Sequence, residues 1–127
     1  MPAPLSASLI DFIHICVPTY QAAEVLLFLA AHPDRDFSAE EVVVAMHPVA
    51  ISLAAVKEHT SLFVSKGLIK EAHGRYTYGP GTAELARDVA GLVPAYNERP
   101  VNLIRFIYRL ADSTLQSFAD SFKLRED

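Results

Sequence analysis

Four basic side chains gather in the middle of the sequence: Lys57, Lys66, Lys70 and Arg75. Lysine and arginine bind the phosphate groups of nucleic acids, so a basic segment of this kind is typical of a phosphate-binding surface. The same segment contains Glu58 and Glu71, which favour the alternative that the cations only form a solvated face of mixed charge. The first interpretation requires an element that holds the cations on one side of the folded chain.

The histidines and the cysteine are the other residues that could do chemistry. The sequence has five histidines: His14, His32, His47, His59 and His73. Their spacing is not that of metal ligands, and Cys16 lies in an apolar run where nothing nearby lowers its pKa. There is no set of paired carboxylates, no Ser/His/Asp set and no glycine-rich phosphate loop. We therefore expect no catalytic residue, no metal site and no cofactor, and we expect that the protein is not an enzyme.

The composition is typical of one folded domain. The chain has 127 residues, of which 51% are hydrophobic and 20% charged, so we expect a single domain over residues 1–127. The net charge of −4 argues against general adhesion to nucleic acid or anionic lipid. One cysteine excludes a disulfide framework, and no apolar run approaches the ~20 residues that span a membrane. Since the first residues lack the basic region of a signal peptide, we expect a soluble, cytoplasmic protein without a membrane partner.

Three helices are predicted in the first half of the chain. The apolar pattern indicates helices over Leu5–Cys16 and Gln21–Ala31, and the segment HPDRDF ends the second of them. Ser38 and Glu41 then have the spacing of a capping box, which opens a short helix through Val42–Met46. The residues HPVAI that follow are expected to form a turn.

A longer helix and a hairpin follow this turn. Ser52 is a second capping residue, and the helix that it opens extends through Lys66 to Gly67, which supplies a left-handed conformation. The residues expected on the buried side of this helix are Val56, His59, Thr60, Phe63 and Val64. Leu68–Tyr78 reads as two short strands joined by a turn at Gly74.

Residues 81–127 are expected to form a C-terminal helical extension. A helix capped by Thr82 should be kinked or ended by Pro94, and a helix over Val101–Leu110 is apolar on most sides. Because a short chain has few elements to cover such a helix, we favour a homodimer interface over a core helix covered by its own chain. The residues expected in this interface are Val101, Ile104, Ile107, Tyr108 and Phe118.

The predicted fold is therefore mainly α with a small β-hairpin, and the order of its elements resembles that of bacterial winged helix-turn-helix transcriptional regulators of the MarR/ArsR-like kind. The similar stretch is SAEEVVVAM…ISLAAVKEHTSLFVSKGLIKEAHGRYTYGPG, within an expected core at residues 20–80 that is flanked by N- and C-terminal helices. The residues that match the pattern typical of such proteins are Ser52, Val56, Phe63, Gly67, Leu68 and Ile69.

The resemblance implies a DNA-binding transcriptional regulator. Ser52–Lys66 would be the recognition helix in the major groove of double-stranded DNA, and Leu68–Tyr78 would be the wing beside it. The residues expected to contact DNA are Ser52, Leu53, Ala54, Lys57, Glu58, Ser61, Lys66, Lys70, His73 and Arg75.

A second interpretation uses the same winged-helix fold to bind and regulate a partner protein, without strong DNA binding. The outer side of the presumed recognition helix lacks Arg, Asn and Gln, which make the bidentate contacts that distinguish bases. The acidic net charge, the carboxylate of Glu58 and the apolar start of this helix at Leu53, Ala54 and Ala55 also favour a protein partner.

Overall fold

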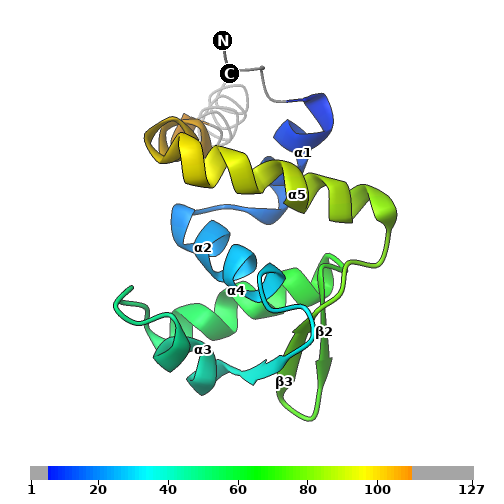
Figure 1. Cartoon of the computed structure of the whole chain (residues 1–127), viewed down its shortest axis with the longest axis vertical. Helices are drawn as coiled ribbons and strands as arrows, with labels where there is room; N and C mark the ends of the chain where they lie inside the picture. Colours follow the sequence, from blue (N-terminus) through cyan, green and yellow to red (C-terminus); the bar gives the residue numbers. More distant parts are fainter. Residues whose placement is uncertain (1–5, 110–127) are drawn as a thin grey trace, which may run out of the picture.

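The computed structural model describes residues 6–109, which form a mainly helical fold with a small three-stranded antiparallel sheet (Figure 1). The elements in chain order are α1 (Ala7–Cys16), α2 (Tyr20–Ala30), β1 (Asp36–Ser38), α3 (Ala39–Ala45), α4 (Leu53–Ser65), β2 (Ile69–Ala72), β3 (Arg75–Tyr78) and α5 (Ala83–Glu98). A further helix covers residues 100–109. The predicted mainly α class is confirmed, and the predicted hairpin belongs to a larger sheet.

Capping side chains open the helices at the predicted positions. Ser38 accepts a hydrogen bond from the backbone N–H of Glu41, while the Glu41 carboxylate accepts one from the N–H of Ser38, which completes the capping box of α3. Ser52 and Thr82 cap α4 and α5 in the same way, each through its hydroxyl oxygen. Caps of this kind contribute about 0.5–2 kcal/mol each, and they need only local sequence, so their positions were predictable.

The sheet has the strand order β1-β3-β2, with β3 in the centre. β2 and β3 form the predicted hairpin, and its two turn residues, His73 and Gly74, have φ values of 54° and 75°. Two consecutive positive φ values match the right-handed twist of the flanking strands, which is why glycine is favoured at such turns.

The strand β1 is not predicted by the sequence pattern. It lies in the segment that ends α2, and it pairs antiparallel with β3, so that Phe37 stands opposite Tyr76 and Ser38 opposite Arg75. Three residues are too few to show an alternating pattern, and the pairing joins positions far apart in the chain. β1 nevertheless connects α2 and α3 to the hairpin.

The core is organised around α2, which lies between α5 and α4 (Figure 1). Its fully buried side chains are Ala22, Ala23, Val25, Leu26 and Leu29. They belong to one continuous cluster of buried residues that extends from Leu9 on α1 to Ile107 near the end of the described chain. The N-terminal helix and the helix at residues 100–109 thus share one core with the segment between them.

The helix α5 continues through Pro94 to Glu98. Of the two outcomes expected at Pro94, a kink or an end, the end does not occur, and α5 extends over another turn, which carries Tyr96. Within residues 6–109 no single helix is long and apolar enough to cross a membrane. Only α1 and α2 taken together have the required length and hydropathy, and the angle between them is 105°.

Candidate nucleic-acid interface

The helix α4 has one buried and one exposed side. Val56, His59, Thr60 and Phe63 are buried against the core, as predicted, while Val64 is only half-buried. The residues on the opposite side, at the spacing of one helical face, are Ala54, Lys57, Glu58 and Ser61, and all four are exposed. Ser52 and Leu53, at the start of the helix, are exposed as well.

The polar residues on the buried side of α4 are satisfied by hydrogen bonds within the chain. The Thr60 hydroxyl donates to the carbonyl oxygen of Val56 at 2.8 Å, and Nε2 of His59 lies 3.3 Å from the side-chain oxygen of Gln21 on α2. Burial lowers the pKa of His59, which favours the neutral imidazole. The contact between His59 and Gln21 links α4 to α2, whereas the Thr60 hydrogen bond lies within α4.

Gly67 determines how the hairpin follows α4. Its φ of +76° is a left-handed conformation that ends the helix, and the N–H of Leu68 then donates to the carbonyl oxygen of Phe63 at 3.0 Å. The chain turns directly into β2, so that Lys66 and Lys70 are separated only by this turn. Both lysines, and His73 at the hairpin tip, are exposed.

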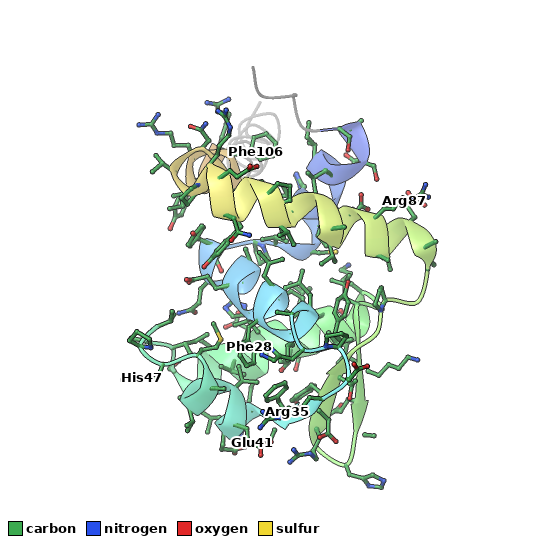
Figure 2. The ribbon with its side chains drawn as sticks, viewed as in Figure 1. Phe28, Arg35, Glu41, His47, Arg87 and Phe106 are labelled. Carbon is green, nitrogen blue, oxygen red and sulfur yellow. The ribbon has the colours of Figure 1, made fainter. Side chains whose placement is uncertain are left out.

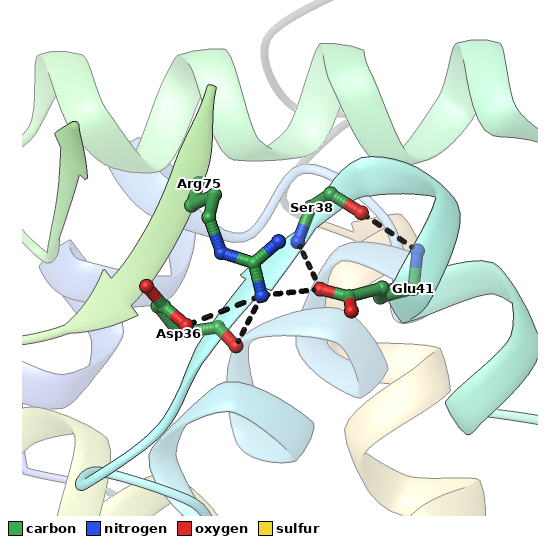
Figure 3. A network of polar contacts seen from close by, with 4 residues as sticks. All are labelled: Asp36, Ser38, Glu41 and Arg75. Carbon is green, nitrogen blue, oxygen red and sulfur yellow. Dashed lines mark hydrogen bonds and ion pairs between the residues drawn. The ribbon is translucent and has the colours of Figure 1, made fainter. Parts of the chain in front are cut away.

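Arg75 has a different environment from the three lysines (Figure 3). Its Nη2 atom lies 2.6 Å from Oε1 of Glu41 and 3.2 Å from Oδ1 of Asp36. The same nitrogen donates to the backbone carbonyl oxygen of Asp36 at 3.4 Å. Since Glu41 Oε1 also accepts the N–H of Ser38, one guanidinium joins β3, β1 and the capping box of α3.

This network changes the pKa values of its members. The carboxylate of Asp36 and, less strongly, that of Glu41 raise the pKa of Arg75. The N–H of Ser38, followed by the positive charge of Arg75, lowers the pKa of Glu41. These contacts weaken the expectation that Arg75 contacts DNA phosphate, because two carboxylates of its own chain compensate its charge. β1 supplies one of them, and for that reason the sequence did not reveal the network.

The remaining predicted cations are Lys57, Lys66 and Lys70. None of them forms an ion pair within residues 6–109, although Glu58 and Glu71 stand beside them in the sequence. β2 packs against α4, so the hairpin lies beside this helix, whereas Ser52 and Leu53 lie at the other end of α4 from the turn into β2. Nine of the ten predicted contact residues are exposed, and Arg75 has a structural role in the network with Asp36 and Glu41.

The predicted dimer residues separate into two groups. Ile107 is only 2% exposed and belongs to the core of its own chain, so its assignment to a dimer interface is corrected. Val101 and Tyr108 are 57% and 56% exposed, and Ile104 is half-buried. Phe118 lies outside the described residues. The helix at residues 100–109 therefore buries one side, with Leu103 and Ile107, in the core cluster and leaves an apolar strip outside.

The described chain shows no arrangement for a metal. No group of three His, Cys, Asp or Glu side chains within residues 6–109 could hold an ion. Cys16 is buried, and burial raises the pKa of its thiol, which keeps it protonated.

Comparisons of the chain with protein-family models, with curated proteins and with solved structures give no match.

Proposed function

We propose that the chain is a cytoplasmic winged helix-turn-helix protein that binds double-stranded DNA and regulates transcription. In this proposal α2, α3 and α4 form the helical unit, α4 is the recognition helix and the β2–β3 hairpin is the wing. The observation that supports it most is the element order α2-β1-α3-α4-β2-β3, in which the hairpin follows α4 and packs against it through β2.

The charges on this surface suit contact with the DNA backbone more than base readout. Lys57 lies on the outer face of α4, and Lys66 and Lys70 flank the turn into the wing. Three lysines provide a modest number of phosphate contacts, which a second subunit would double. Ser52 and Ser61 can donate to phosphate oxygens or base edges, whereas no exposed residue on α4 makes the bidentate contacts of Arg, Asn or Gln.

The direct test is binding to fluorescently labelled genomic fragments at low and at moderate salt. We expect the wild-type protein to bind at low salt and to lose affinity as salt rises, because bound phosphates release counterions. The variant Lys57→Glu with Lys70→Glu should weaken binding by about tenfold or more, since it replaces two attractive charges with repulsive ones. A folded wild-type protein that does not bind at low salt would exclude this function.

A matched control uses two arginines away from this surface. Arg87 lies on the outer side of α5 (Figure 2), and Arg105 is exposed on the helix at residues 100–109. Arg87→Glu with Arg105→Glu changes the net charge as much as the lysine variant does. Affinity within about threefold of the wild type is expected, so an equal loss in both variants would mean that only the net charge matters.

We further propose that the protein is a homodimer through the exposed apolar strip of Val101, Ile104 and Tyr108. These positions recur at helical spacing on one side of the helix at residues 100–109. Val101→Asp with Tyr108→Asp should lower the mass measured by analytical ultracentrifugation to that of one chain. The neighbouring Asn102→Asp is the control and should leave the mass unchanged. A double variant that keeps the wild-type mass would contradict this interface.

A second candidate function is the binding of a partner protein through the same region. Apolar side chains are exposed around the start of α4: Val44 at 74%, Val49 at 37% and Leu53 at 37%. These exposed apolar side chains and the compensated charge of Arg75 favour a partner protein over DNA as the ligand of this region. A folded protein without DNA affinity at low salt, combined with a solubility gain in Val44→Ser with Leu53→Ser, would support this candidate instead.

A further inference from the structure

A groove opens beside α2. It has a volume of about 530 Å³, within the usual range of small-molecule sites. Its walls come from α2, from the C-terminal part of α5 and from the connection between α3 and α4. The apolar lining residues are Leu27, Phe28, Met46, Val49 and Val93, together with three alanines.

One carboxylate, that of Glu24, lines this otherwise apolar groove. Its Oε2 atom accepts a hydrogen bond of 3.3 Å from the Tyr96 hydroxyl. Burial and the nearby Glu24 raise the pKa of Tyr96 to about 12, so the hydroxyl keeps its proton and remains a neutral donor. The ring of Tyr96 also stacks on that of Tyr20, with centroids 5.4 Å apart, which fixes the side chain in the groove wall.

The charge of Glu24 has no counter-ion in the described chain. The ion pairs within residues 6–109 are those of Arg75 with Asp36 and Glu41, and the only other polar lining residues are Tyr96 and Asn97. A half-buried carboxylate among apolar side chains is stabilised by a cation that brings its own apolar surface, and it repels an anion. The electron-rich ring face of Tyr96 also attracts cations.

We propose that this groove binds a hydrophobic organic cation, whose positive group pairs with Glu24 and whose apolar part lies against Leu27, Met46 and Val93. The inference does not depend on DNA binding, because its readout is the binding of the small molecule itself.

The test compares three probes that share one alkyl chain. Octyltrimethylammonium is the cation, octanoate the anion and octanol the neutral control, each measured by calorimetry with the whole protein below the concentration at which the probe aggregates. We expect saturable binding of the cation, and binding of the anion weaker by at least about tenfold, because only the cation compensates Glu24. Equal affinity for the cation and octanol would show that Glu24 contributes nothing and would overturn the proposal.

Variants then locate the site. Glu24→Gln keeps the shape of the side chain and should weaken cation binding by about tenfold while leaving octanol binding unchanged. Val49→Lys adds a positive charge at the groove, and Val44→Lys adds the same charge on α3, outside the lining. Cation binding should be lost in the first variant and retained in the second. Unchanged binding in Glu24→Gln, or equal loss in both lysine variants, would contradict the assignment; circular dichroism of each variant confirms that it is folded.

Discussion

The four cations that lie close together in the sequence have two different roles in the structure. Arg75 is held by two carboxylates and a carbonyl oxygen, at a place where a sheet edge meets the start of a helix. Lys57, Lys66 and Lys70 carry exposed charges and form no ion pair within residues 6–109. Proximity in sequence therefore says little about what a charge does, because strand pairing decides which carboxylates come near it.

The planar shape of the guanidinium group explains why an arginine, and not a lysine, stands at position 75 between the two carboxylates. A guanidinium carries several donors, and in Arg75 the Nη2 atom alone contacts Oδ1 and the carbonyl oxygen of Asp36 and Oε1 of Glu41. An exposed ammonium on a flexible stem is better suited to a moving partner such as a phosphate backbone. The comparison leads to four predictions, which are given below in order of decreasing effect.

Reversal of charge at the two kinds of position should have very different consequences for stability. Arg75→Glu would place a third carboxylate beside Asp36 and Glu41, so we expect a large fall in melting temperature and loss of protection in β1. Lys57→Glu, on the open face of α4, should change the free energy of unfolding by less than about 0.5 kcal/mol. Chemical denaturation of both variants measures the difference, and similar losses would remove the distinction between the two roles.

Acid should weaken the network around Arg75 in a defined pH window. The pKa of Glu41 is lower in the folded chain than its ordinary value of 4.5, so the unfolded chain takes up a proton more readily. The ionised Glu41 carboxylate therefore stabilises the folded chain fully at pH values above 4.5. This stabilisation is lost as the pH falls through the lower pKa of Glu41 in the folded chain. Unfolding free energies measured across this window should fall less steeply in Glu41→Gln; an identical slope would mean that Glu41 does not carry the effect.

His59 should give a smaller dependence at higher pH. Its pKa in the folded chain is lower than the ordinary value of 6.5 because the ring is buried, so the unfolded chain binds the proton more tightly. The contribution of neutral His59 to the free energy of unfolding is therefore fully present above pH 6.5. It decreases as the pH falls through the pKa of His59 in the folded chain. His59→Gln should remove this component of the pH dependence, as measured by denaturation at successive pH values. A free energy of unfolding that rises as the pH falls below 6.5 would contradict a lowered pKa of His59.

The hairpin turn should give the smallest effect. His73 has a positive φ of 54°, which costs a non-glycine residue some backbone energy, and Gly74 has a φ of 75° with open space around it. His73→Asn should stabilise the protein by a few tenths of a kcal/mol, and Gly74→Ala should destabilise it by about 1 kcal/mol. Thermal unfolding of the two variants checks both signs, and stabilisation by alanine would contradict the turn geometry.

Local signals predicted most of the fold. The capping box of Ser38 and Glu41, the cap at Ser52 and the left-handed Gly67 all depend on residues within a few positions of one another, and the structure has each of them. β1 could not be predicted in this way, because its three residues gain their structure only by pairing with β3.

The site was predicted less completely than the fold, for the same physical reason. Arg75 and Glu41 are 34 positions apart in sequence, and the two residues that meet in the groove, Glu24 and Tyr96, are 72 apart. Contacts at such separations depend on the packing of whole elements, which periodicity and caps do not specify. The exposed face of α4 was predictable because one helix provides all of it.

The most direct test of the division between these cations is the salt dependence of DNA binding. The logarithm of the affinity should fall linearly with the logarithm of salt concentration, with a slope of about −0.9 for each phosphate contact. Lys57→Gln should make the slope shallower by about 0.9 for each chain in the complex, while Arg75→Gln, under conditions where it is folded, should leave the slope unchanged. A slope that Arg75→Gln reduces and Lys57→Gln does not would contradict the account.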